Sequence, residues 1–384
     1  MFQSIFIYGF IIIALFLSFQ VGITKEGNTI TVTKPKQYYL FTLFGIAVFT
    51  FFSAVRWDVG IDYLSYLKTY NAISDSSIVL RDDLEVGYVF LQKLLVKLGA
   101  HFTIYFGLVA FLQLCFAILY FNKEKYLLPY FLVLIMCGGD YFFWMNGMRQ
   151  ALVSTCLLFV LSQTVDNKKI LIFIISMFLL SYIHKSALIL LPLCLLYYLP
   201  LDNVYIKKPL QFILFFSVIV LSDLSIWQYL LDIVDGAMSF IGYERFTDGT
   251  LETLEVRDMN FGVRRIIFLI IDIVIITYSD KLRQVYKSRK FGLSLLLFIV
   301  FYTFYPLFIS SLVFSRIVGY FSVFRIIMVS YLLFYLFRIK NTPINYCVGL
   351  AIIMLFLMHL FIQIYADPGH HTDCIRYQFF WDYI

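Results

Sequence analysis

Long apolar runs separated by short polar connections make up most of this 384-residue chain. A membrane-spanning helix needs about 20 mostly apolar residues, and a dozen runs approach or reach that length. The pattern therefore predicts an all-α fold, a polytopic membrane bundle of about twelve transmembrane helices that forms a single membrane-embedded domain over residues 1–384. The expected helices cover residues 2–19, 38–55, 102–121, 126–138, 147–162, 169–182, 187–199, 209–221, 263–279, 292–314, 317–337 and 344–364.

The composition supports this interpretation and excludes several protein classes. Hydrophobic residues make up 61% of the chain and charged residues 14%, whereas a soluble domain is about 45–50% apolar. The polar stretches are too short for a separate catalytic or nucleic-acid-binding domain, which needs about 100 residues. Five of the six cysteines lie in or beside apolar runs, so we expect neither a disulfide framework nor a zinc site.

Two polar segments, 56–100 and 222–265, are longer than the other connections. In the first, Tyr63, Tyr66 and Tyr70 recur at helical spacing, and Asp82 with Glu85 three residues later resembles a capping box at the start of a second helix. The second segment opens with an amphipathic stretch and continues as an acidic, aromatic loop. We expect both segments to form helices on the membrane surface, although the tyrosines could equally form an interfacial aromatic belt.

Lysine and arginine are unevenly distributed between alternate connections. One set of connections carries sixteen cations and five acids, and the other carries fourteen cations and eighteen acids. Because cytoplasmic loops of membrane proteins are rich in Lys and Arg, the first set is predicted to be cytoplasmic. Both termini, the two long segments and a tail at 365–384 then lie on the outer face.

The type of cation also differs between the two faces. The expected cytoplasmic connections hold thirteen Lys and three Arg, whereas the outer set holds four Lys and ten Arg. Arginine binds phosphate and carboxylate groups through two parallel hydrogen bonds, so a group of outer arginines indicates an anionic ligand. The alternative is that individual arginines pair with the outer acids.

Two charged residues fall inside expected spans. Asp272 lies seven residues beyond Arg265, and Arg325 lies nine residues beyond Arg316, which places both charges about 10–13 Å below the outer helix ends at 1.5 Å per residue. A charge at that depth is normally paired, so we predict an ion pair between Asp272 and Arg325. Nine residues also put Arg325 on the opposite side of its helix from Arg316, which leaves Arg316 for an outer site.

Five short motifs occur in order at the expected outer helix ends. They are Arg56-x-x-Val-Gly-x-Asp62-Tyr63-x-x-Tyr66, Glu85-x-Gly87-Tyr88, Asn146-x-x-Arg149-Gln150, His184-x-Ser186-Ala187-Leu and Arg316-x-x-x-Tyr320-Phe. Together they resemble the EpsG family of bacterial exopolysaccharide proteins, which is similar to the Wzy-type polymerases of O-antigen and capsule. The triplet that reads Gly-Thr-Asp in the family is Gly60-Ile61-Asp62 here, which removes a hydroxyl beside Asp62.

The resemblance implies a fold, a reaction and a location. It implies a helical bundle like those of the GT-C glycosyltransferases, and a polysaccharide polymerase that moves a glycan from a polyprenyl-pyrophosphate carrier to a hydroxyl of a lipid-linked acceptor repeat unit. The reaction would occur at the outer, periplasmic face of the cytoplasmic (inner) membrane of a bacterium. Expected partners are the two lipid-linked oligosaccharides, the lipid bilayer, a flippase and a chain-length regulator, with no nucleic acid.

Such a transfer needs positive charge near the departing pyrophosphate. No acidic pair stands out as a Mg²⁺ site, so we expect outer arginines in place of a metal. The resemblance therefore implies a metal-independent glycosyltransferase without cofactors. The expected pyrophosphate-binding residues are Arg56, Arg149, Arg264, Arg265 and Arg316.

The attacking hydroxyl needs a general base, and two residues are candidates. His184 is the only histidine beside other motif residues at an outer helix junction, Asp62 is the alternative base, and His184 could instead be a hydrogen-bonded turn residue. The expected catalytic residues are His184, Asp62, Arg149 and Arg316. Carboxylates accept hydrogen bonds from sugar hydroxyls and aromatic rings cover apolar sugar faces, which gives the expected sugar-binding residues Asp58, Tyr63, Tyr66, Glu85 and Tyr320.

Two other functions fit part of the sequence. A lipid-oligosaccharide transporter or flippase would place its polar residues near the membrane midplane, whereas the unusual polar residues here gather on one face. A membrane O-acyltransferase acting on polysaccharide could use His184 to activate a sugar hydroxyl. The many outer arginines favour a pyrophosphate donor over an acyl donor.

Overall fold

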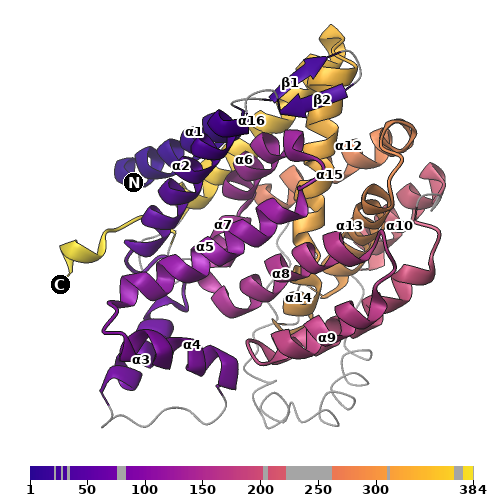
Figure 1. Cartoon of the computed structure of the whole chain (residues 1–384). Coiled ribbons are helices and arrows are strands. Elements are labelled where there is room, and N and C mark those ends of the chain that lie inside the picture. Colours follow the sequence, from indigo (N-terminus) through magenta and orange to yellow (C-terminus); the bar gives the residue numbers. More distant parts are fainter. Residues whose placement is uncertain are drawn as a thin grey trace. The chain divides into compact units, whose positions relative to one another are not determined.

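Each of the twelve apolar segments is helical over most of its length (Figure 1). The computed structural model describes residues 1–20, 23–26, 29–32, 35–75, 84–201, 206–221, 262–308, 312–366 and 375–383, so the amphipathic stretch and most of the loop expected at 222–265 lie outside the described residues. The helices are α1 (Phe2–Gln20), α2 (Pro35–Ala54), α3 (Tyr63–Ser74), α4 (Val86–Lys97), α5 (Phe102–Tyr120), α6 (Leu128–Gly138), α7 (Asp140–Asn146), α8 (Met148–Thr164), α9 (Ile170–Ser181), the 3-10 helix η2 (Lys185–Tyr198), α10 (Lys208–Leu221), α12 (Val263–Val285), α13 (Arg289–Phe308), α14 (Leu312–Gly319), α15 (Ser322–Phe334) and α16 (Pro343–Ala366).

Six stretches of helix in the described residues are long and apolar enough to cross a membrane. The helices α6 and α7, which meet at a 67° bend, would together form a seventh span, and α9, η2 and α10 are shorter apolar helices. The chain is therefore a polytopic helical membrane protein, as the hydrophobic pattern predicts. The six stretches are Phe2–Gln20, Lys36–Ala54, Phe102–Tyr120, Arg289–Leu307, Arg316–Ile339 and Pro343–Ala366.

The connection between α1 and α2 contains an element that the hydrophobic pattern does not predict. Two strands, β1 (Ile23–Glu26) and β2 (Thr29–Val32), pair in antiparallel register, with Ile23 opposite Val32 and Lys25 opposite Ile30. β-Branched Ile, Thr and Val favour extended backbone. Strands of four residues are too short to stand out beside apolar runs of membrane-spanning length.

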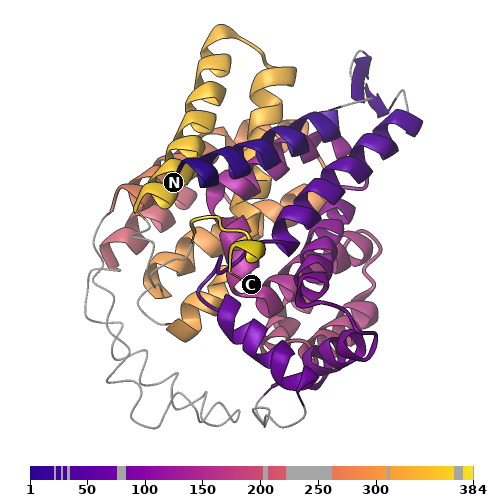
Figure 2. The ribbon, with the colours of Figure 1, turned by 90° about the vertical axis from the view of Figure 1, so that its left-hand side faces the viewer.

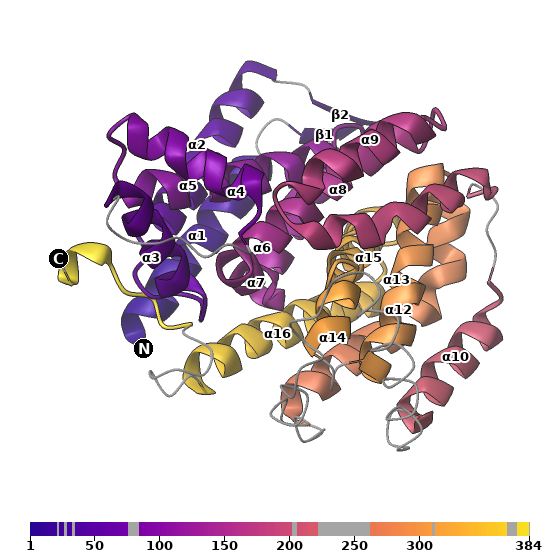
Figure 3. The ribbon, with the colours of Figure 1, turned by 90° about the horizontal axis from the view of Figure 1, so that it is seen from below.

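The chain divides into two compact units. The first contains Met1–Pro200 and Val329–Ile384, and the second contains Leu201–Met328. In the first unit, α5 packs against α2 and α8, and α1 packs against α2 and α6 (Figure 3). Large apolar side chains such as Phe6, Leu40 and Phe111 are exposed on these helices, as expected for faces that contact lipid. The organisation of the chain as a single membrane-embedded domain stays a prediction.

Two short helices form in the first long polar segment. Tyr63, Tyr66 and Tyr70 are all buried along one side of α3, which confirms the helical spacing. The capping-box prediction for α4 is wrong, because Glu85 occupies the N-cap position and makes no capping hydrogen bond. Its carboxylate is engaged in contacts with distant parts of the chain, which are described below. Asp82 lies outside the described residues.

The second unit contains the predicted ion pair. Arg325 on α15 donates from Nε to Asp272 Oδ1 and from Nη2 to Asp272 Oδ2 on α12, both at 2.7 Å. The rings of Phe268 and Phe301 lie 4.7 and 4.6 Å from the guanidinium carbon. The helix arithmetic is confirmed, and the pair is enclosed by aromatic side chains.

The C-terminal segment 375–383 contacts the first half of α1 and the residues that follow the end of α2 (Figure 2). The Tyr8 hydroxyl donates to the Ile375 carbonyl at 2.6 Å. The Trp57 amide donates to the Gln378 carbonyl at 2.9 Å, and the Phe380 amide donates to the Val55 carbonyl at 3.0 Å. These backbone bonds hold the tail beside the loop that leads from α2 to α3.

Candidate functional site

Glu85 lies between a histidine and an arginine that come from distant parts of the chain. His184 Nδ1 is 2.9 Å from Glu85 Oε1, and Arg149 Nη1 donates to Glu85 Oε2. The Glu85 side chain is 7% exposed, whereas those of His184 and Arg149 are 22% and 26% exposed. A buried carboxylate thus holds two side chains that both reach the surface of the unit.

The charge state of Glu85 determines how His184 is held. Burial acts to raise the pKa of Glu85, but the hydrogen bond from His184 and the charge of Arg149 outweigh burial and lower the pKa to about 2. The carboxylate is therefore ionised at neutral pH and accepts the proton of His184 Nδ1. In a neutral imidazole, this bond leaves Nε2 as the nitrogen with a free lone pair.

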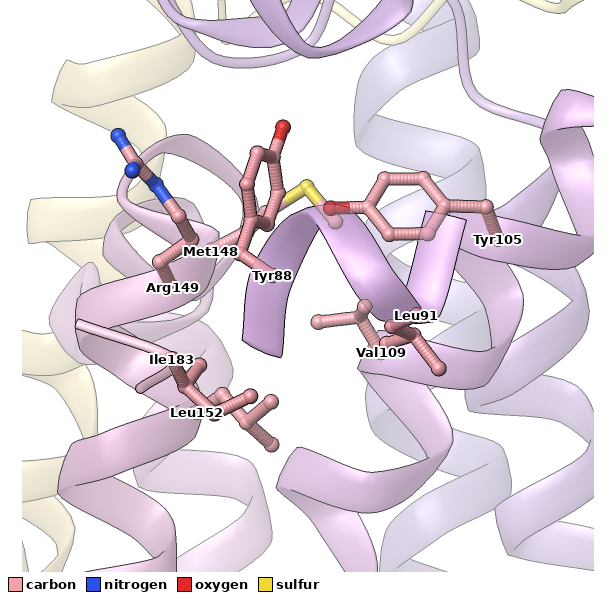
Figure 4. Close-up of a pocket in the computed structure, with 8 residues that line it drawn as sticks. All are labelled: Tyr88, Leu91, Tyr105, Val109, Met148, Arg149, Leu152 and Ile183. Atoms are coloured by element: carbon pink, nitrogen blue, oxygen red, sulfur yellow. The ribbon is translucent and has the colours of Figure 1, made fainter. Parts of the chain in front are cut away.

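Tyr88 and Tyr66 complete the surroundings of Arg149, and Figure 4 shows the first of them beside it. The guanidinium carbon lies 4.8 Å from the centre of the Tyr88 ring, and the Tyr66 hydroxyl is hydrogen-bonded to Arg149. Burial raises the pKa of Tyr66 to about 12, despite the opposing charge of Arg149, so the hydroxyl is neutral. Arg149 Nε is buried and has no hydrogen-bond partner among the described residues. We call Tyr66, Glu85, Tyr88, Arg149 and His184 the Glu85 cluster.

Gly87 explains how Glu85 reaches His184. Its amide donates to the carbonyl of Tyr182 at 2.8 Å, so the first turn of α4 lies against the end of α9 and the residues that lead to His184. A Cβ atom at position 87 would lie 2.8 Å from the Tyr182 carbonyl oxygen. Any side chain there would push α4 and Glu85 away from His184.

Gly60 allows a second close approach, between the loop before α3 and the end of α7. Its φ of +98° is unfavourable for other residues, and a Cβ would lie 2.9 Å from Asn146 Cα. Two residues later, the Asp62 amide donates to Asn146 Oδ1 at 2.8 Å. Since Asn146 precedes Arg149 by three residues, this contact brings Asp62 to the neighbourhood of the cluster, where its charge acts on Tyr66.

Arg56 lies in the protein interior. Its guanidinium is fully buried, donates to the carbonyls of Ser53 and Met145, and lies 4.9 Å from the centre of the Phe106 ring. Tyr63 is stacked on the same Phe106 ring at 4.6 Å. The surroundings of both side chains favour packing roles, while the pyrophosphate and sugar contacts expected for them stay predictions.

The other expected site residues lie apart from the cluster or in the second unit. Asp58 is half-buried in the loop before α3, with a φ of 50°. In the second unit, Arg264 and Arg316 are exposed, Arg265 is half-buried and Tyr320 is buried. Their parts in catalysis, pyrophosphate binding and sugar binding stay predictions.

Two residues in and beside the cluster were not predicted to have a role in the site. Tyr88 and Asn146 stand in the motifs, but residue types alone did not assign them a contact. Glu85 contacts His184 and Arg149, and the sugar contact expected for it stays a prediction. Within the described part of the chain, no three His, Cys, Asp or Glu side chains come together in a way that could hold a metal.

Comparison with known proteins identifies the family. The sequence model of the EpsG family matches residues 38–379, which covers most of the chain and all five motifs. No curated protein matches the chain, and no solved structure matches it either.

Proposed function

Because the chain belongs to the EpsG family of membrane proteins of polysaccharide biosynthesis, we propose that it is a polymerase. It transfers a glycan from a polyprenyl-pyrophosphate carrier to a hydroxyl of a lipid-linked acceptor repeat unit, at the outer face of the cytoplasmic membrane. The observation that best supports this proposal is the Glu85 carboxylate, which holds a candidate base through one oxygen and a candidate anion-binding side chain through the other.

His184 acts as the general base in this proposal. Its Nδ1 is fixed by Glu85 at 2.9 Å, so Nε2 receives the proton of the acceptor hydroxyl. The oxygen of that hydroxyl forms a bond to the anomeric carbon of the donor glycan. An ionised carboxylate that orients and later stabilises an imidazolium is the arrangement that serine hydrolases use.

Arg149 stabilises the leaving group. When the bond between the anomeric carbon and the pyrophosphate oxygen breaks, the electron pair stays on the pyrophosphate, and its charge is favoured by a nearby guanidinium. Arg149 donates to Glu85 from Nη1, and its buried Nε has no hydrogen-bond partner among the described residues. The Tyr88 ring and the Tyr66 hydroxyl fix the plane of the guanidinium. Arg264, Arg265 and Arg316, which belong to the second unit, are also proposed to bind pyrophosphate.

Asp62 remains the alternative base. It lies beside the cluster through its contact with Asn146 and, unlike Glu85, forms no ion pair with another of the described residues. The exposed part of its half-buried side chain could accept a proton from a hydroxyl. Direct comparison of Asp62 and His184 variants therefore decides the assignment.

The test of the function uses purified protein in nanodiscs and lipid-linked repeat units extracted from host cells that lack this protein. The wild type should convert single units into polymer and release polyprenyl pyrophosphate, and Arg149→Ala should do neither. Lys97→Ala is a matched control, because this cation lies at the far end of α4 from the cluster.

Three results separate the candidate functions. Polymer formed in nanodiscs, which do not separate two compartments, supports a transferase. Movement of intact units across vesicles without polymer would establish a flippase, and transfer of an acyl group to the glycan would establish an O-acyltransferase. Either of the last two results overturns the proposal. A flippase that supplies the units and a chain-length regulator are proposed as partners in the cell.

A further inference from the structure

A group of aromatic rings lies where the C-terminal segment meets the loop between α2 and α3. Trp381 is stacked on Phe379, with ring centres 4.3 Å apart and planes 14° apart. Tyr383 is stacked on Trp57, with centres 5.6 Å apart and planes 7° apart. We call these four residues, which form two parallel pairs, the aromatic platform.

One ring of each pair is open to the surroundings. Trp381 is 49% exposed and Tyr383 is 53% exposed. The rings on which they stack, Phe379 and Trp57, are half-buried. About half of each of the Trp381 and Tyr383 side chains is therefore accessible to a ligand. Flat aromatic faces of this kind pack against the apolar C–H faces of sugar rings, while the Tyr hydroxyl and the Trp N–H offer polar contacts at the edge.

The platform is held in place before any ligand arrives. The Trp57 amide donates to the Gln378 carbonyl at 2.9 Å, and the Phe380 amide donates to the Val55 carbonyl at 3.0 Å. The Tyr377 hydroxyl donates to the Phe52 carbonyl at 2.7 Å. Since these bonds already fix the tail, binding does not have to order a loose segment, which favours affinity.

The charge at the platform favours a neutral, hydroxyl-rich ligand. Asp382 is exposed and stands between the two exposed rings in the sequence. A carboxylate accepts hydrogen bonds from sugar hydroxyls, whereas it repels anionic lipid headgroups.

The platform is connected to the Glu85 cluster through α3. The rings of Trp57 and Tyr63 make a T-shaped contact with centres 5.7 Å apart, and Tyr66, one helical turn further along α3, is hydrogen-bonded to Arg149. Both contacts belong to the first unit. The platform is therefore linked through packed side chains to the residues proposed to carry out transfer.

We propose that the aromatic platform is a glycan-binding site, in which Trp381 and Tyr383 pack on sugar rings and Asp382 accepts hydrogen bonds from their hydroxyls. The identification of this glycan as the repeat-unit oligosaccharide rests on the proposed function. The site binds the sugar portion of the lipid-linked substrate and does not touch the bond that breaks.

The experiment measures binding apart from transfer. The probe is the oligosaccharide released by mild acid from the host's own lipid-linked repeat unit, and binding to protein in nanodiscs is followed by saturation-transfer NMR. Trp381→Ala and Tyr383→Ala should each weaken binding roughly 5- to 10-fold. In the transfer assay they should raise KM for the lipid-linked unit and leave kcat within about twofold. The control Tyr198→Ala removes a ring that is 73% exposed and should change neither quantity.

The outcomes separate this inference from the proposed function. If the Trp381→Ala protein binds the oligosaccharide as well as the wild type, the platform is not a glycan site, and polymerisation by the same sample leaves the proposed function intact. A wild type that binds through Trp381 but never forms polymer keeps the platform and removes the polymerase. Quenching of Trp381 fluorescence by brominated lipids, measured against Trp381→Phe, would show a membrane anchor and overturn the inference.

Discussion

Each unit of this protein contains a carboxylate bound to an arginine, and the two pairs differ in what remains available. Asp272 gives both oxygens to Arg325, and the two side chains are 2% and 12% exposed. Glu85 gives one oxygen to Arg149 and the other to His184, and these partners are 26% and 22% exposed. In the first pair, the two charged groups bind each other and are mostly buried. In the second, Arg149 and His184 are bound to Glu85 but remain partly exposed and accessible to a ligand.

This difference indicates which pair supports the fold and which supports chemistry. A bidentate ion pair enclosed by two phenylalanine rings stabilises the fold, because neither charge is left unpaired inside the helical bundle. A carboxylate divided between a histidine and an arginine instead fixes the tautomer of one and the orientation of the other. Substitutions should therefore affect the amount of folded protein in one unit and the rate of transfer in the other.

The largest effect is expected for His184. His184→Ala should lower the transfer rate about 10²–10⁴-fold, the usual contribution of a general base, and leave the yield of folded protein unchanged. If Asp62 is the base, Asp62→Asn should show that loss instead, and His184→Ala only a modest one. Transfer rates of both variants at equal protein concentration decide between the two candidate bases. If His184→Gln kept most of the wild-type rate, His184 would be a hydrogen-bonded turn residue and not the base.

Asp272→Ala should have the next largest effect, on stability. Removing one partner of a buried ion pair typically costs about 3–5 kcal/mol, so size-exclusion chromatography in detergent should show much less folded protein. The molecules that do fold should transfer glycan at the normal rate. Replacing both partners, in Asp272→Leu with Arg325→Met, should recover much of the yield, because no unpaired charge remains. A normal yield of Asp272→Ala would show that the pair does not support the fold.

The contrast also shows what the sequence could predict. The Asp272 and Arg325 pair followed from counting residues along two regular helices, because depth in a helix depends only on residue number. The helical face of Tyr63, Tyr66 and Tyr70 followed from spacing in the same way. Local periodicity was sufficient wherever the structure is a regular helix.

The Glu85 contacts could not be obtained by such counting. Glu85, Arg149 and His184 come from three segments, and their meeting depends on how α4 packs against the end of α9 at Gly87. The motifs named all three residues but gave no distances, so the contacts of Glu85 with His184 and Arg149 were not predicted and Glu85 was wrongly placed in a capping box. Its expected sugar contact stays a prediction. The short β1 and β2 strands and the stacked aromatic tail were missed for a similar reason, since each depends on a partner distant in the chain or on a very short element.

A smaller effect is expected in the dependence of stability on pH. The folded-state pKa of Glu85 is about 2, below the usual value near 4.3, so the unfolded chain binds more protons between these values. The ionised Glu85 therefore adds about 3 kcal/mol to the free energy of unfolding above pH 5, and this contribution is lost as the pH falls towards 2. Melting temperatures in detergent between pH 6 and pH 3 should fall less steeply for Glu85→Gln than for the wild type. The control Asp382→Asn, at an exposed carboxylate, should show the same dependence of melting temperature on pH as the wild type. If Glu85→Gln also showed the wild-type dependence, Glu85 would not have the lowered pKa.

The smallest effect is expected for removal of metal ions. Glu85 has both oxygens engaged by His184 and Arg149, which leaves it poorly placed to bind a cation, and Arg149 supplies positive charge where a metal would otherwise be needed. The rate of purified protein should therefore change by less than about twofold in excess EDTA. A metal-dependent glycosyltransferase in the same buffer should lose its activity and serves as the control. If EDTA abolished transfer and Mg²⁺ or Mn²⁺ restored it, Asp58, Asp62 and Glu85 would be the candidate ligands, and the Glu85 cluster would have to rearrange when the substrate binds.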